Sequence, residues 1–83
     1  MKMDNRVAMM NIILEAISAI EDINKIIHEY RDNVLGRMGM PYRPKHVNII
    51  VSIALEAPKE VISEISTRIE ELDGVKVQTA FSK

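Results

Sequence analysis

The 83-residue sequence predicts an α+β sandwich in which two helices cover one face of a four-stranded antiparallel sheet. Three observations lead to this fold class. Apolar residues alternate or run together along four short segments, they recur at helical spacing along two others, and the six segments follow the order β-α-β-β-α-β. A chain of this length is expected to form one domain over residues 1–83.

Arg6 to Leu14 is predicted to be the first strand, because it is β-branched and apolar and carries no helix-capping residue. Alternate residues of a strand point to opposite faces. Here one face carries Val7, Met9 and Ile13, and the other carries Ala8, Met10, Ile12 and Leu14. A strand that is apolar on both faces belongs in the middle of a sheet, and its second face also needs cover.

The two helices are predicted from apolar stripes at helical spacing. The first runs from Ser18 to Tyr30, where Ser18 and Glu21 have the spacing of a capping box. The second runs from Pro58 to Leu72, with Gly74 placed to end it in a left-handed conformation. The stripes consist of Ile20, Ile23, Ile27 and Tyr30 in the first helix, and of Val61, Ile62, Ile65, Ile69 and Leu72 in the second.

Three more strands complete the sheet. Val34 to Met40 is weakened by two glycines, which often mark a bulge or a close backbone approach. His46 to Leu55 is the clearest strand, and Val75 to Phe81 alternates in polarity. The apolar first and third strands are expected at the centre and the other two at the edges. Right-handed crossovers then place both helices on one face, which is the ferredoxin-like fold.

This fold leaves one sheet face without helices, and here that face is expected to carry apolar side chains from the first and third strands. Exposed apolar patches usually mark an interface. We therefore expect a homo-oligomer, a dimer or a tetramer, that forms through the sheet face or by edge-strand pairing. The alternative is a monomer whose open face is mixed and hydrated.

The composition excludes several classes of function. A net charge of −1 and a pI near 6.1 argue against direct binding of nucleic acid or of an anionic membrane. The predicted middle strands also lack the aromatic residues on which bases stack in RNA-binding domains of this fold. With no cysteine, the chain has no thiolate nucleophile and no disulfide, which fits a cytoplasmic location. No apolar run is long enough to cross a membrane.

No constellation of catalytic or cofactor-binding residues stands out, so no catalytic residue and no cofactor is predicted. The paired carboxylates fall on predicted helix surfaces. His28 and His46 are the only histidines, and a symmetric interface would be needed to bring enough of them together for a metal. A half-exposed helix residue and a strand-edge residue are the simpler interpretation, and no metal site is predicted.

The most unusual segment is the candidate ligand site, and it combines glycines, flexible methionines, a stiff turn and two guanidinium groups. Its residues are Gly36, Arg37, Met38, Gly39, Met40, Tyr42 and Arg43. Arg37 and Arg43 are placed to clamp a carboxylate or phosphate, and the methionines to line an adaptable apolar contact. The alternative is an edge strand whose glycines and charges discourage aggregation.

A family resemblance rests on five groups of residues. They are Arg6-Val7-Ala8, Ile12-Ile13-Leu14-Glu15, Asn24 with Ile27-His28-Glu29-Tyr30, Gly36-Arg37-Met38-Gly39-Met40-Pro41-Tyr42-Arg43, and Gly74-Val75-Lys76-Val77 with Thr79. In these residues the sequence resembles the regulators of iron-only hydrogenase systems. The resemblance implies an ACT-like regulatory domain that oligomerises, similar in fold to the C-terminal domain of the nickel-responsive regulator.

Two departures limit what this resemblance implies. ACT domains that bind amino acids place a glycine after the first strand, whereas this chain has Glu15-Ala16-Ile17, so amino-acid binding is not carried over. The nickel-responsive domain uses histidines and a cysteine, and this chain has no matching set, so nickel binding is not carried over either.

The sequence therefore favours a non-enzymatic regulatory domain that oligomerises and binds a small ligand. Two alternatives stay open. One is an interaction scaffold that binds another protein and no ligand. The other is a small cofactor-free enzyme that works in an interface cavity.

Overall fold

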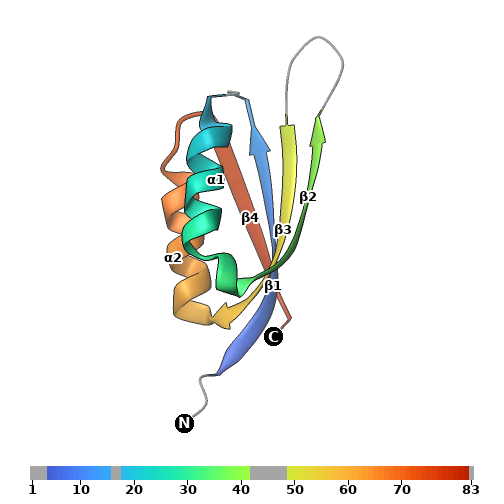
Figure 1. Ribbon diagram of the computed structural model, residues 1–83, viewed down its shortest axis with the longest axis vertical. Coiled ribbons are helices and arrows are strands. Elements are labelled where there is room, and N and C mark those ends of the chain that lie inside the picture. The colour runs from blue at the N-terminus through green and yellow to red at the C-terminus, as the bar shows by residue number, and fades with distance from the viewer. Residues whose placement is uncertain (1–3, 16–17, 42–48, 83) are drawn as a thin grey trace.

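Four antiparallel strands form one sheet in the order β2-β3-β1-β4, and both helices lie on the same face of it (Figure 1). The computed structural model describes residues 4–15, 18–41 and 49–82. Its elements are β1 (Asn5–Leu14), α1 (Ala19–Glu29), a single 3-10 turn η1 (Arg31–Asn33), β2 (Val34–Pro41), β3 (Ile49–Pro58), α2 (Lys59–Glu70) and β4 (Val75–Phe81). The ferredoxin-like α+β fold is thus confirmed, with the first and third strands at the centre and the second and fourth at the edges.

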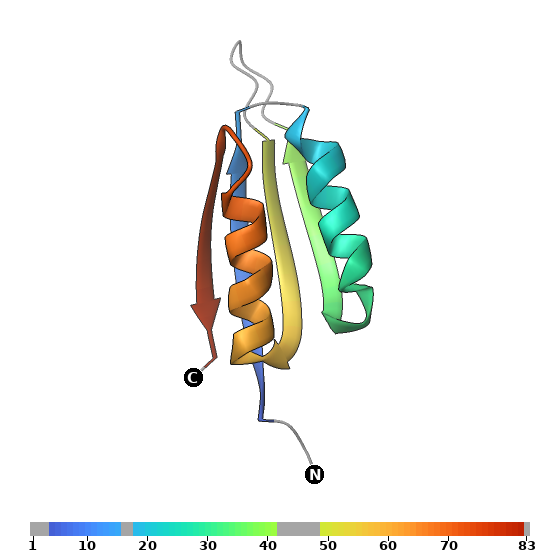
Figure 2. The ribbon, with the colours of Figure 1, turned by 90° about the vertical axis from the view of Figure 1, so that its left-hand side faces the viewer.

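The two helices pack side by side, with α1 toward the β2 edge and α2 toward the β4 edge (Figure 2). Each helix turns an apolar stripe to the sheet, but the stripe of α1 differs from the prediction, because Ala19 and Ile26 are buried in place of Ile20 and Tyr30. In α1 the buried residues are Ala19, Ile23, Ile26 and Ile27, and in α2 they are Ile62, Ile65 and Ile69. The remaining stripe residues Ile20, Tyr30, Val61 and Leu72 are partly buried at its border.

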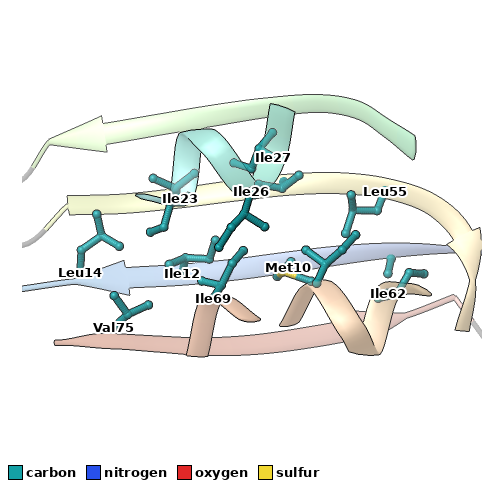
Figure 3. Packing of buried hydrophobic residues seen from close by; sticks show 14 of the residues in the cluster. Met10, Ile12, Leu14, Ile23, Ile26, Ile27, Leu55, Ile62, Ile69 and Val75 are labelled. Carbon is teal, nitrogen blue, oxygen red and sulfur yellow. The ribbon is translucent and has the colours of Figure 1, made fainter. Parts of the chain in front are cut away.

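β1 shows how completely the alternation of a strand separates the two faces of the sheet. Ala8, Met10, Ile12 and Leu14 are at most 1% exposed and point into the layer under the helices (Figure 3). Between them, Val7, Met9 and Ile13 point to the other face and are exposed. The period of two in the sequence predicted both sets of residues. The buried set of β1 packs against Val51, Ile53 and Leu55 of β3.

Two details at the helix ends differ from the prediction. The backbone of Ser18 is already helical, with φ −60° and ψ −24°, and its hydroxyl makes no capping bond, so the predicted capping box is wrong. Pro58 has extended ψ of 149° and pairs with Asn5 as the last residue of β3, so α2 begins only at Lys59. Strand pairing therefore holds Pro58 outside the first helical turn.

Gly74 confirms only part of its prediction. It has φ 74°, the left-handed conformation expected of it, but α2 already ends at Glu70 with Glu71 as its C-cap, so Gly74 lies in the turn before β4 and not at the helix end. Its carbonyl accepts a 2.8 Å hydrogen bond from the backbone N–H of Glu15. This bond ties the start of β4 to the end of β1. The predicted first residues of the third strand, 46–48, lie outside the described residues.

Candidate functional site

The glycine- and methionine-rich segment lies on β2, and the strand divides it between two faces. Gly36, Met38 and Met40 pair with residues of β3 that face away from the helices. Arg37 and Gly39 pair with Ile53 and Val51, which are buried under the helices. The candidate site is therefore not one continuous surface, because neighbouring residues of a strand point in opposite directions.

The side chain of Arg37 reaches toward the helix layer. Its Nη1 donates a 2.9 Å hydrogen bond to Oδ1 of Asn24 on α1. This contact directs the guanidinium away from the face that Met38 and Met40 share. Tyr42 and Arg43 lie outside the described residues, so the predicted clamp between the two arginines stays a prediction.

The face without helices, called the open face below, is formed by alternate residues of all four strands. Register places the following residues on it: Val7, Met9, Asn11 and Ile13 of β1; Gly36, Met38 and Met40 of β2; Ile50, Ser52, Ala54 and Glu56 of β3; and Lys76, Gln78 and Ala80 of β4. Its large apolar side chains are strongly exposed: Val7 44%, Met9 41%, Ile13 46%, Met38 63% and Met40 54%. The predicted open apolar face is thus present, but these side chains come from β1 and β2, whereas the expected contribution of β3 is limited to Ile50 and Ala54 beside Ser52 and Glu56.

A shallow hollow of about 160 Å³ lies on the open face where small residues adjoin in neighbouring strands. It is lined by Met9, Gly36, Arg37, Met38, Ser52 and Ala54. A Cβ atom added at Gly36 would meet no heavy atom within 4 Å, so the glycine makes no close approach within the chain. The predicted irregularity is present, because the β2–β3 register shifts between Val34 and Gly36.

The centre of the open face carries a polar pair. Ser52 Oγ donates a 2.9 Å hydrogen bond to Asn11 Oδ1 across the β1–β3 pairing. Gln78 of β4 pairs with Asn11 from the other side, so a short polar row crosses the middle of an otherwise apolar surface. Hydrogen-bonded polar groups of this kind can be covered at small cost.

A second hollow, of about 190 Å³, lies on the helix side between α2 and β4. Four of its six lining residues carry a hydroxyl group; the lining consists of Ile62, Ser63, Ser66, Thr67, Thr79 and Phe81. Oγ1 of Thr79 is buried there without a hydrogen-bond partner among the described residues. The inward direction of Thr79 follows from strand alternation, but the hollow itself depends on how α2 packs and has no signal in the sequence.

A bidentate ion pair ties the end of α1 to α2. Arg68 Nη1 and Nη2 donate hydrogen bonds of 2.7 and 3.1 Å to the two carboxylate oxygens of Glu29, and Nη1 also lies 3.3 Å from Oη of Tyr30. That hydroxyl donates a 3.0 Å hydrogen bond to Glu64. The bonds from Arg68 lower the pKa of Glu29. The cluster is a link between the two helices, on the opposite side of the sheet from the open face.

Replacing Arg68 with methionine is expected to lower the thermal unfolding midpoint at neutral pH, because it removes the partner of the Glu29 carboxylate. Folding lowers the pKa of Glu29 from its ordinary value of 4.5. The ion pair therefore contributes its full stabilisation at pH values above 4.5. That stabilisation is lost as the pH falls through the lowered value. Thermal melts followed by circular dichroism should therefore show a gap between the two proteins at neutral pH that narrows in acid. A gap that does not depend on pH would contradict this account.

Of the two histidines considered from the sequence, the structure describes one. His28 is exposed on α1, and His46 lies outside the described residues. Among residues 4–15, 18–41 and 49–82, no group of three or more histidine, aspartate or glutamate side chains is placed to hold a metal ion. No helix in this part of the chain is long and apolar enough to span a membrane.

The comparisons with known proteins agree with this geometry. The TM1266-like family, described as "Iron-only hydrogenase system regulator, putative", matches residues 6–79. The structure of the uncharacterized protein TM1266 from Thermotoga maritima superposes with a TM-score of 0.86 at 25% identity, over 96% of this chain and all (100%) of that one. No curated protein matches the sequence.

More distant structures share the fold alone. The C-terminal domain of the MgtC protein from Mycobacterium tuberculosis has a TM-score of 0.75 at 12% identity, over 99% of this chain and 93% of that one. A protein of unknown function from Galdieria sulphuraria has a TM-score of 0.73 at 12% identity, over 100% of this chain and 53% of that one. Together, the family match over nearly the whole chain and the similarity to TM1266 show that this chain belongs to the TM1266-like family of iron-only hydrogenase system regulators.

Proposed function

We propose that this chain is a non-catalytic regulatory domain that acts in the cytoplasm by binding on its open face. A small ligand in the hollow beside Gly36 would favour one assembly of the domain over another. A ligand shifts such an equilibrium only by the difference in its affinity for the two states. The family supports the regulatory role, and the exposed apolar side chains of the open face support binding and assembly on that surface.

The hollow is the observation that carries the proposal. It brings Gly36, Arg37 and Met38 of the predicted segment together with Met9, Ser52 and Ala54. Apolar side chains form most of its wall, the Ser52 hydroxyl is the polar group within it, and the Arg37 guanidinium is bonded to Asn24 on the helix side. This lining fits a small, uncharged and mainly apolar ligand better than the carboxylate or phosphate expected from two arginines.

We assign no reaction to the domain. Two of the described residues, Glu29 and Arg68, have clearly shifted pKa values, and their position supports this view. Glu29 and Arg68 bond to each other between the helices, on the opposite side of the sheet from the hollow. They serve the contact between α1 and α2, so they are not available as an acid and a base at the open face.

An interaction scaffold without a ligand is a second candidate, and the extent of the exposed apolar face favours it. Five large apolar side chains on that face are each more than two-fifths exposed. Such a surface binds another protein as readily as it frames a small ligand. If the domain is such a scaffold, the hollow accommodates a protruding side chain of the other protein.

Native mass spectrometry of protein purified gently from the cells that make it tests the ligand. We expect a discrete extra mass per chain, and we expect Ala54→Leu to lose it, because the larger side chain fills the hollow. Lys25→Leu is the control, since Lys25 is exposed on α1, on the opposite side of the sheet from both the hollow and the open face. An unaltered protein that carries no extra mass, or an Ala54→Leu variant that retains it, removes the ligand from the proposal.

A further inference from the structure

We propose that a second copy of this chain covers the open face, and that the two copies are related by a two-fold axis that crosses the strands near the middle of the face. The inference rests on the proposed function for its biological role, since assembly is what the ligand would control. The physical argument for it depends only on the residues of the open face.

The dimensions of the open face can be compared with the area that a stable interface buries. With four strands and the seven residues of β4 as its length, the face measures roughly 19 by 24 Å. A stable interface buries about 800 Å² of accessible surface on each partner. The flat area of the face is about half of this value, and side chains that project from it add to its accessible surface, so an interface of standard size on this side of the sheet needs the whole open face.

The open face consists of rows of side chains that run across the strands. In the order β2, β3, β1, β4, the first full row is Gly36, Ala54, Met9 and Ala80. The next is Met38, Ser52, Asn11 and Gln78, and the one after is Met40, Ile50, Ile13 and Lys76. Glu56 and Val7 lie side by side beyond the first row. The middle of the face therefore lies between the Gly36 row and the Met38 row.

A two-fold axis that runs across the strands places the Gly36 row of one copy over the Met38 row of the other, and each strand over the same strand of the partner. The Met38 side chain then lies over the partner's Gly36, and Gln78 lies over the partner's Ala80. Ile13 lies over the partner's Val7. Large side chains meet small ones at both edges of the sheet, which is how the surfaces of stacked sheets interdigitate.

The other simple arrangement, with the axis along the strands, fits less well. With this axis each row lies over the same row of the partner, and β2 of one copy lies over β4 of the other. Gly36 would then lie over the partner's Ala80 and leave a gap, while Met38 would collide with the partner's Gln78. Gaps and collisions both cost stability in a packed layer. The pattern of small and large residues therefore selects the axis across the strands.

Charge agrees with the same choice. Within the paired parts of the four strands, the open face carries two charged side chains: Glu56 at one end and Lys76 at the other. The axis across the strands brings the partner's Lys76 to the end where Glu56 lies, whereas an axis along the strands keeps the opposite charges at opposite ends. The two charges lie two strands apart in this arrangement, so they do not form an ion pair, but their opposite signs at one rim favour this axis over the other.

Gly36 provides the sharpest test, because the fold of one chain does not require it. An added Cβ meets no heavy atom within 4 Å, and its φ is not positive. The same is true of Gly39, which faces the helix side through its pairing with Val51. Valine favours strands at either place. Only at Gly36 would valine occupy the space that the partner's Met38 needs.

The experiment is sedimentation equilibrium of the full chain and of Gly36→Val and Gly39→Val, with circular dichroism to verify the fold. We expect at least a tenfold rise in the dimer dissociation constant for Gly36→Val and a change of less than about twofold for Gly39→Val. Adding Met38→Ala to Gly36→Val should restore part of the lost affinity, because the smaller side chain again fits the partner. Equal effects of the two valines, or an unaltered chain that is monomeric, would overturn the inference.

The same samples separate this inference from the ligand proposal. A dimer that carries no extra mass and responds to Gly36→Val alone supports the inference and removes the ligand. A monomer that carries the ligand supports the ligand and overturns the inference. A dimer that loses affinity equally with both valines also overturns it, whether or not a ligand is present.

Discussion

Replacing Ile12 with alanine is expected to destabilise the fold by about 2–5 kcal/mol, whereas the same change at Ile13 costs about 1 kcal/mol or less. The two isoleucines are neighbours on β1 and pair with neighbouring residues of β3. Ile12 is 0% exposed beneath the helices, and Ile13 is 46% exposed on the open face. Removing the side chain of Ile12 therefore leaves a cavity in the core (Figure 3). Removing that of Ile13 leaves only a smaller surface side chain.

Urea denaturation of the two variants at low protein concentration measures the difference. The low concentration matters because Ile13 also lies in the proposed contact between copies, where its loss would weaken association. Similar losses of unfolding free energy at the two sites would mean that β1 does not have one buried and one open face. The layered arrangement would then be incorrect.

A glutamate at Met9 is expected to convert the assembled protein to monomers. Met9 lies on central strand β1 beside Ala54 and Ala80, in the row next to the middle of the open face. A carboxylate there would be buried by a second copy without a positively charged partner, and such burial costs several kcal/mol. Because Met9 is 41% exposed in the single chain, the fold itself should tolerate the change.

Ser63→Glu is the control for this substitution. Ser63 is exposed on α2, on the opposite side of the sheet, so the same new charge there should leave the assembly intact. Size-exclusion chromatography with light scattering compares the two variants. An assembly that survives Met9→Glu, or that is lost equally in Ser63→Glu, would contradict a contact through the open face.

Much of the fold follows from local patterns that each have a physical cause. The period of two in Arg6 to Leu14 predicted both faces of β1, and Gly74 adopts the left-handed conformation for which a glycine was expected. The capping box failed because Ser18 already has helical backbone angles. A proline at this position favours the first helical turn, whereas the pairing of Pro58 with Asn5 is a long-range contact that no local pattern encodes.

The candidate site was harder to predict than the fold. Treating Gly36 to Arg43 as one cluster overlooked the strand period, which sends Arg37 to the helix side and Met38 to the open face. The register shift between Val34 and Gly36 also changes which residues of β2 share a face, and it has no clear signal beyond the glycine.

The hollow depends on pairing between distant segments. Met9 and Ala54 are paired across β1 and β3, and Gly36 joins them from β2, so the three residues meet only in the folded sheet. The sequence did predict that this face would be apolar and in need of cover. It did not contain the row order from which the mode of self-packing is argued, because that order exists only once all three strand pairings are known.

The mass of the unaltered protein in solution tests the central claim most directly. Sedimentation equilibrium or native mass spectrometry should show an assembly of at least twice the 9.4 kDa chain mass at micromolar concentration. This result is expected because the open face leaves five large apolar side chains exposed in a single chain. A particle of 9.4 kDa at every concentration would contradict the claim that a second copy covers the open face.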